Sequence, residues 1–194
     1  MDAIDLWLLR YEAVHGFILS DFFEGLSEAQ VRGRPVPGVN TLSWLLWHVL
    51  RIEDVGVNRF VLDRSQVLDD GWLDRLRVGR RDVGTGMDEA HVDALSARID
   101  LEALRGYGQA LTRATLGAVP LLRSLDLESM VAADRVRQVC TSEGAVDPSA
   151  SWLTEFWAGG RARAWILLQT SLLHLYGHYF EGLAIKGLWG RPSP

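Results

Sequence analysis

Hydrophobic residues recur at the spacing of an α-helix in four long stretches of the chain. The first runs from Ile4 to about Gly25, and the second from Asn40 or Thr41 to about Leu62. The third runs from Leu101 to about Leu125, and the fourth from Arg161 to about Lys186. Because no run of alternating strand residues separates them, the pattern predicts an all-α protein, a four-helix bundle.

Glycine and proline mark the connections between these helices. The segment 31–39 cannot continue a helix, and charged, glycine-rich residues 63–86 predict peripheral structure with one short helix near 72–77. Residues 87–97 predict another short helix, and Pro120 predicts a kink or early end of the third long one. The stretch 126–160 is expected to be irregular and long enough for a crossover connection. We therefore expect one domain over residues 1–190 and a short tail at 191–194.

The distribution of charge argues against a nucleic-acid partner. The net charge is −5, and basic and acidic residues are interspersed, so we expect no nucleic-acid partner. The acidic N-terminal residues do not resemble a secretory signal, and polar residues interrupt the most apolar stretch, 165–180. A cytoplasmic protein without a membrane partner is expected. Cys140 is the only cysteine, which fits a reducing compartment and predicts a partly buried free thiol.

Two histidines in the fourth helix are spaced to bind one ion. His174 and His178 stand at positions i and i+4, on one face of the helix. Thr170, Ser171 and Glu181 extend this face as a polar stripe along a helix that is otherwise largely apolar. A polar stripe inside a bundle needs an explanation.

A third histidine lies on the inward face of the second helix. The neighbours of His48 at helical spacing include Trp44, Leu45 and Ile52, so its imidazole is expected to point into the core. A lone histidine there is usually a hydrogen-bonded core residue, but the pair opposite makes it a candidate ligand. His48, His174 and His178 would then fill three positions around a divalent metal ion and leave at least one open, as in a reactive site.

The remaining polar candidates have simpler interpretations. His15 and His91 have no partner at a suitable spacing and are expected at the surface. No glutamate follows His174, so the helical zinc-protease motif is incomplete and peptidase activity is disfavoured. Glu53 and Asp54 do not share the helix face of His48, which favours outer-shell or salt-bridge roles.

The three histidines and their context resemble a known family. The stretch from Ser43 to Asp54, with Trp47-His48 and Arg51-Ile52-Glu53-Asp54, together with the H-x-x-x-H pair at 174–178, is similar to the DinB-like (YfiT-like) metalloenzymes. The resemblance covers about residues 1–190. It implies a four-helix bundle with crossover topology, a three-histidine metal site and frequent dimers.

In some members of this family the implied activity is thiol transfer with mycothiol, bacillithiol or glutathione. The expected metal is zinc, with nickel or iron(II) as alternatives that also suit imidazole ligands. Lys186 is the only lysine among 20 basic residues, a bias typical of GC-rich genomes, and mycothiol suits such a source. A metal-dependent thiol transferase or isomerase acting on a small-molecule substrate is therefore the first hypothesis.

Two other hypotheses stay open on the sequence alone. A metal-dependent hydrolase would need Glu181, Asp54 or Glu53 as a general base. A non-catalytic bundle would use its eight tryptophans to bind a small apolar ligand or a second subunit, although Trp44 and Trp47 are more typical of core packing.

Overall fold

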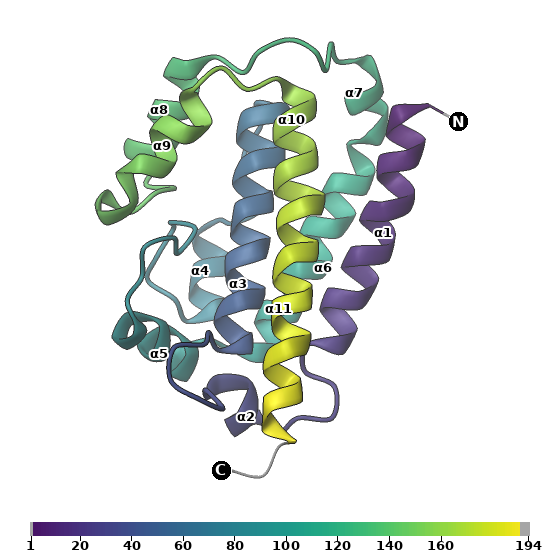
Figure 1. Ribbon diagram of the computed structural model, residues 1–194. Coiled ribbons are helices and arrows are strands. Elements are labelled where there is room, and N and C mark those ends of the chain that lie inside the picture. Colours follow the sequence, from purple (N-terminus) through teal and green to yellow (C-terminus); the bar gives the residue numbers. More distant parts are fainter. Residues whose placement is uncertain (1, 191–194) are drawn as a thin grey trace.

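Four long helical rods run side by side in the computed structural model, which describes residues 2–190 (Figure 1). The first rod is α1 (Ala3–Asp21), and the third is α6 (Leu101–Gly117). The second joins α3 (Leu42–Glu53) to the π-helical segment η1 (Asp54–Val61). The fourth joins α10 (Arg163–Leu168), the π-helical η3 (Gln169–Leu173) and α11 (His174–Trp189). The predicted all-α four-helix bundle is confirmed.

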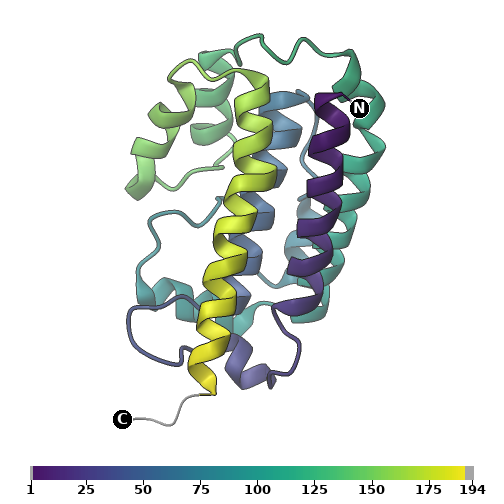
Figure 2. The ribbon, with the colours of Figure 1, turned by 45° about the vertical axis from the view of Figure 1, so that its right-hand side comes forward.

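Long connections give the bundle its crossover topology. After the second rod, the chain returns outside the bundle through α4 (Asp70–Leu76) and α5 (Glu89–Arg98), so the second and third rods run parallel (Figure 1). A second long connection crosses one end of the bundle to the start of the fourth rod (Figure 2). The other short helices are α2 (Glu28–Arg32), α7 (Val119–Ser124), α8 (Ala133–Thr141), the 3-10 turn η2 (Pro148–Ala150) and α9 (Ser151–Ala158).

Side-chain caps explain where three of the rods begin. Asp2 forms a capping box with Asp5, the Thr41 hydroxyl accepts the backbone N–H of Trp44, and Asp100 accepts that of Ala103. Each cap satisfies a backbone donor that has no partner inside its own helix. The third rod ends at Gly117, and Pro120 lies in the first turn of α7, so the predicted interruption is confirmed.

The helix α3 is the central element of the bundle. All of its residues are buried, and Leu45 and Trp47 have no exposed surface. The rod contacts both α6 and α11 and is covered by α5 on another side. Any polar side chain on α3, His48 included, therefore lies in the interior and needs a partner there.

The expectation that residues 126–160 are irregular was wrong. They contain α8, η2 and α9, which pack against each other and against η1. Val136, Val139 and Trp157 are buried in this arm, and the ring of Trp157 meets that of Phe60 edge-on at 5.3 Å. These short helices are stable because tertiary contacts bury their apolar side chains. The glycine, proline and serine residues of this stretch predict irregular structure and give no sign of those contacts.

The second and fourth rods approach closely where both become π-helical. Gly56 in η1 faces Thr170 in η3, and a Cβ at position 56 would come within 2.3 Å of the Thr170 hydroxyl oxygen. Only glycine permits this approach. No helix within residues 2–190 combines the length and apolar character needed to cross a bilayer. The expected tail, 191–194, lies outside the described residues.

Candidate metal centre

Three histidines from two rods meet at the interface of α3 and α11. His48 projects from α3, and His174 and His178 project from the first turns of α11, with one ligand atom from each lying within 4.8 Å of the others. The ring centroids are 4.8 Å apart for His48 and His174, 5.1 Å for His48 and His178, and 4.5 Å for the α11 pair. The structure thus brings together the three residues that the sequence analysis selected.

The orientation of His48 is fixed by its neighbours. Its Nδ1–H donates to the carbonyl oxygen of Val83 at 2.5 Å, which leaves Nε2 without a proton and free to bind. Trp44 stacks on the imidazole with ring centroids 4.7 Å apart and an interplanar angle of 7°. Gly84 keeps the loop in place, since its φ is +80° and a Cβ there would lie 2.4 Å from the Trp47 ring.

His178 is oriented by a carboxylate. Its Nδ1–H donates to Oε2 of Glu181 at 2.6 Å, and Oε1 of Glu181 accepts the Asn40 side-chain amide at 2.8 Å. The Nε2 atom of His178 is therefore the nitrogen available for binding. A carboxylate behind a ligating histidine raises its basicity and fixes its tautomer, as in carboxylate–histidine–zinc arrangements.

His174 differs from the other two because its Nδ1 atom is buried and has no hydrogen-bond partner among the described residues. Burial without a partner is costly for a polar nitrogen. A ligand bound at Nδ1 would supply the missing interaction.

Burial keeps the imidazoles of His48 and His174 in the neutral form that binds metals. Desolvation, with a contribution from nearby His178, lowers the pKa of His48 to about 4. Desolvation and the neighbouring rings also hold the pKa of His174 well below its usual value. Burial alone would raise the pKa of Glu181, but hydrogen bonds from His178 and Asn40 outweigh it and lower that pKa. The cluster thus combines two imidazoles held neutral, those of His48 and His174, with the ionised carboxylate of Glu181.

These observations fit a divalent metal ion. Three imidazole nitrogens within a few ångströms of one another suit zinc, nickel or iron(II). Two donors have ordered outer partners, and the third carries the orphaned nitrogen. The sequence did not indicate that Asn40 and the Val83 carbonyl take part in this site. Asn40 precedes a helix cap and reads as a capping residue, and a backbone carbonyl carries no sequence signal.

The prediction that His15 lies at the surface was wrong. His15 is 2% exposed, and its Nε2 lies 2.7 Å from Oε2 of Glu53, which is fully buried. Glu53 also accepts the Tyr11 hydroxyl at 2.7 Å, and the second ring nitrogen of His15 lies 2.8 Å from the Thr112 hydroxyl. We call His15, Glu53, Tyr11 and Thr112 the His15 network. Glu53 is occupied there, away from the three-histidine cluster.

Asp54 belongs to a separate buried network. Its Oδ2 accepts from Arg51 at 3.1 Å and from the Tyr107 hydroxyl at 2.6 Å, and Oδ1 accepts from Asn58 at 2.6 Å. The backbone N–H groups of residues 67 and 68 also donate to the Asp54 carboxylate. The expected salt-bridge role of Asp54 is therefore observed, and it holds the long connection after η1 against the bundle.

The other candidates do not join the centre. His91 is exposed, as predicted, and pairs with Asp88. Cys140 is fully buried, and burial raises the pKa of its thiol to about 11, so it is not a ready nucleophile. In the polar stripe, the hydroxyl groups of Thr170 and Ser171 donate to carbonyls in their own rod, and Ser171 also accepts from Trp7.

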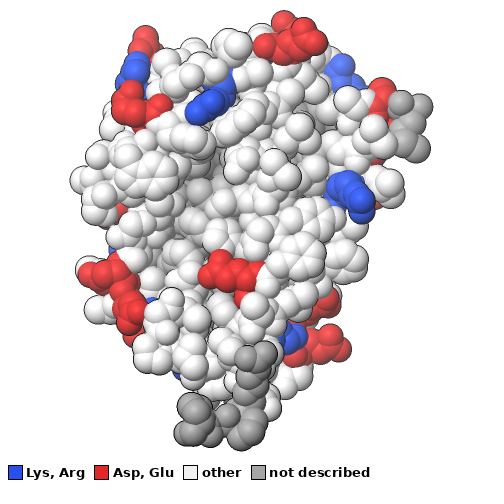
Figure 3. Space-filling model, in the orientation of Figure 1, with Lys and Arg blue, Asp and Glu red and all other residues white. Residues whose placement is uncertain are grey.

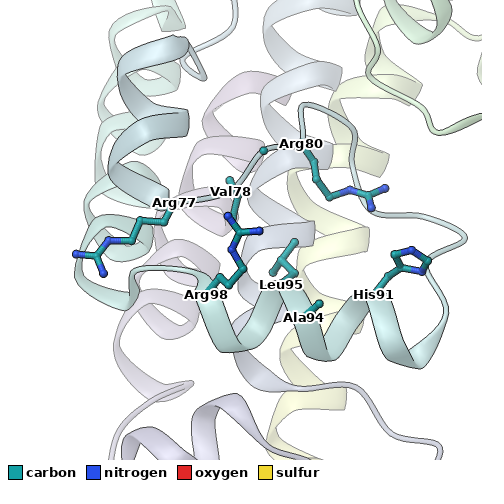
Figure 4. Close-up of a pocket in the computed structure, with 8 residues that line it drawn as sticks. Arg77, Val78, Arg80, His91, Ala94, Leu95 and Arg98 are labelled. Atoms are coloured by element: carbon teal, nitrogen blue, oxygen red, sulfur yellow. The ribbon is translucent and has the colours of Figure 1, made fainter.

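A surface cavity of about 140 Å³ beside α5 lies apart from the histidine cluster, and none of the three histidines lines it. Arg77, Arg80 and Arg98 reach its rim, but Figure 4 shows the Arg77 and Arg80 side chains pointing in opposite directions. Arg80 also pairs with Asp82 and is not free to attract an anion. The cavity does not gather charge as a binding site would.

Comparison with known proteins identifies the family. The family model described as the DinB superfamily matches residues 18–178, a range that contains all three clustered histidines. The chain belongs to the DinB superfamily. None of the curated proteins compared with it matches in sequence.

A solved structure supports the DinB-like fold. The crystal structure of a conserved protein from Enterococcus faecalis superposes with a TM-score of 0.68 at 14% sequence identity, and the match covers 97% of each chain. At this identity the likeness establishes the fold alone, and the chemistry of this DinB-superfamily member must be argued from its own residues.

Proposed function

We propose that this protein is a metal-dependent enzyme in which His48, His174 and His178 hold one divalent ion, zinc first and nickel or iron(II) as alternatives. The proposed reaction is transfer or isomerisation with a low-molecular-weight thiol such as mycothiol on a small-molecule substrate. We further propose that residues 1–190 act as one domain in the cytoplasm.

The single observation that carries this proposal is the set of three imidazoles converging within 4.8 Å, one with an orphaned buried nitrogen. Three protein ligands also leave a coordination position open, which is the pattern of catalytic rather than structural sites.

A bound divalent ion would act as a Lewis acid that lowers the pKa of a coordinated thiol, so that a nucleophile is available at neutral pH. The protein residues have supporting roles. Glu181 and the Val83 carbonyl hold the Nδ1 protons of His178 and His48, which keeps Nε2 of each ring pointed at the centre. Trp44 covers one face of His48 and excludes water from that side.

Transfer is favoured over hydrolysis by the positions of the carboxylates. Glu53 and Asp54 are fully buried and bound in other networks, and Glu181 is bound to His178 and Asn40. A hydrolase needs a carboxylate or imidazole within reach of the attacking water. None of the three carboxylates considered from the sequence is free for that task.

The test begins with metal content. Protein purified without a histidine tag is analysed by mass spectrometry beside His48→Ala, His174→Ala and His178→Ala, with His91→Ala as the control because His91 is exposed. We expect about one equivalent of metal in the wild type and the control, and loss in the three folded variants.

Activity is then measured with mycothiol, bacillithiol and glutathione against an electrophilic fluorogenic acceptor. Metal-dependent turnover that disappears in the three variants supports the proposal. Full metal retention by the variants contradicts the ligand assignment. Metal binding without turnover on any thiol contradicts the transferase and leaves a metal-binding module.

A further inference from the structure

Aromatic side chains of α9 face the start of the fourth rod. The rings of Trp152 and Phe156 lie 6.5 Å apart, and the ring of Phe156 meets that of Trp165 edge-on at 5.6 Å. Trp152 is 61% exposed, Phe156 is 40% exposed, and Trp165 is partly exposed. We call these three residues the aromatic wall. Exposed aromatic side chains that lie together, rather than singly, are typical of a binding surface.

A guanidinium group lies against this wall. Arg161 is placed over the rings of Phe156 and Trp165, 4.8 and 4.6 Å from their centroids, and its Nε–H donates to the Phe156 carbonyl at 3.2 Å. The neighbouring carboxylate of α9, Glu155, is paired with Arg137, and Arg161 forms no ion pair in the described part of the chain. A planar cation that is held in place but not neutralised is suited to bind a carboxylate through its terminal N–H groups.

The aromatic wall and the histidines share one face of the fourth rod. The backbone N–H of Gln169 donates to the carbonyl of Trp165, and the backbone N–H of His174 donates to that of Gln169 across the π-helical turn. Each of these bonds joins residues one turn apart, so the three residues lie on the same face. At about 1.5 Å of rise per residue, Trp165 is roughly 13 Å from His174 along the rod. One elongated ligand can therefore reach both.

A second series of contacts leads from the metal centre to α9. Trp44, which stacks on His48, donates its Nε1–H to Sδ of Met87 at 3.3 Å. A Cβ at the adjacent Gly86 would lie 3.1 Å from that of Ala150 in η2, and η2 leads directly into α9. In Figure 3, the surface between the arm and the fourth rod is hollowed and carries few charged side chains. The histidine cluster and the aromatic wall therefore border the same hollow.

We propose that the aromatic wall and Arg161 bind the substrate of the metal centre, and that this substrate is an elongated aromatic carboxylic acid. This inference rests on the proposed function and names the class of its small-molecule substrate. The ring system stacks on the exposed aromatic rings, the carboxylate binds the Arg161 guanidinium, and the reacting end extends to the histidine cluster. An aliphatic substrate would not use the rings, and a neutral one would not use the cation.

Binding of 2-naphthoate to the full chain, measured by titration calorimetry, tests the wall without requiring turnover. Its neutral counterpart, 2-naphthylmethanol, separates the effect of the ring from that of the charge. Arg161→Gln should weaken binding of naphthoate about 10-fold and leave binding of naphthylmethanol unchanged, because only the acid loses a charge-assisted hydrogen bond. Trp152→Ala should weaken binding of both probes about 3- to 10-fold, because both lose a stacking partner.

Two variants serve as controls. Arg75→Gln removes a guanidinium that lies 3.5 Å over the Trp72 ring, outside the wall, and should bind both probes as the wild type does. His174→Ala removes a proposed metal ligand and should also bind naphthoate normally, because the carboxylate is held by Arg161. Circular dichroism confirms that the variants fold. Trp152→Ala keeps the test decisive if Arg161→Gln does not fold, since truncating an exposed side chain has little effect on stability.

Failure of this inference is distinguishable from failure of the proposed function. Absence of naphthoate binding at about 1 mM overturns the inference, and so does equal affinity in the wild type, Arg161→Gln and Trp152→Ala. Loss of naphthoate binding in Arg75→Gln or His174→Ala would place the probe elsewhere and also overturn it, as would displacement of naphthoate by glutathione, which would assign the wall to the thiol. Naphthoate binding that follows the predicted pattern in a protein without metal or turnover contradicts only the proposed function and supports the wall as a binding site.

Discussion

Two buried groups of polar residues in this bundle contain histidine, and they differ in how well their atoms are satisfied. In the His15 network, both ring nitrogens of His15 have partners, and Glu53 accepts from His15 and Tyr11. In the three-histidine cluster, the rings face one another and one buried nitrogen has no partner among residues 2–190.

The difference separates a structural role from a ligand-binding one. A buried network that satisfies itself joins rods, and here it ties α1 to α3 and α6. A buried polar atom without a partner is costly unless a ligand supplies the missing interaction. Both groups lie between rods and contain a buried histidine, so the property that distinguishes them is whether their hydrogen bonds are satisfied.

The largest effect on stability is expected in the His15 network. Glu53→Ala removes the shared acceptor and leaves Nε2 of His15 and the Tyr11 hydroxyl without the carboxylate that both bind, which should lower the free energy of unfolding by about 3–5 kcal/mol. Urea denaturation measures the loss. Metal content per folded chain should stay unchanged, and a loss of metal in this variant would show that the two groups are coupled.

Acid should destabilise the metal-free protein through the histidine cluster. Folding lowers the pKa of His48 from 6.5 to about 4, so the unfolded chain binds a proton that the folded chain does not. Stability from this group is full above pH 6.5 and falls as the pH drops toward 4, by about 3 kcal/mol. Denaturation of metal-free wild type and His48→Gln across this range measures it.

The His48→Gln variant should lose the part of that slope that belongs to His48. A variant with the same dependence on pH as the wild type would show that His48 is not held neutral in the folded protein. Because His174 is shifted in the same direction, a smaller slope should remain.

The smallest effect is expected from Glu181, which binds the ligand His178 through its Nδ1 atom. Glu181→Gln keeps the shape of the side chain but removes the charge that orients His178, and it should weaken metal affinity about 10–100-fold. Competition with a chelating indicator measures the affinity. Glu155→Gln, which loses a surface pair with Arg137, is the matched control and should bind as the wild type does. If Glu181→Gln binds metal as tightly as the wild type, the Glu181 carboxylate does not contribute to metal binding.

The sequence was sufficient for features that repeat along one helix. The apolar spacing predicted the four rods, and the i, i+4 spacing of His174 and His178 predicted their shared face. It was insufficient where the deciding contact lies far away. His15 has small and charged neighbours in sequence, and its partner Glu53 is 38 residues distant.

The same reason accounts for the short helices of the arm. The helix α8 has an apolar face of only three buried residues, and its stability depends on α9 and η1, which no local pattern reveals. The link between His48 and the Val83 carbonyl is likewise invisible, because every residue has a carbonyl and only the folded loop brings this one to the ring.

The π-helical segment η3 ends one residue before His174. Such a segment holds one residue more per turn than the α-helix around it, and each residue of an α-helix accounts for about 100° of rotation. The wider segment absorbs this extra residue, so α10 and α11 keep nearly the faces that one continuous α-helix would give them. The fourth rod therefore accommodates one residue more than a regular helix of the same length without turning His174 and His178 away from His48.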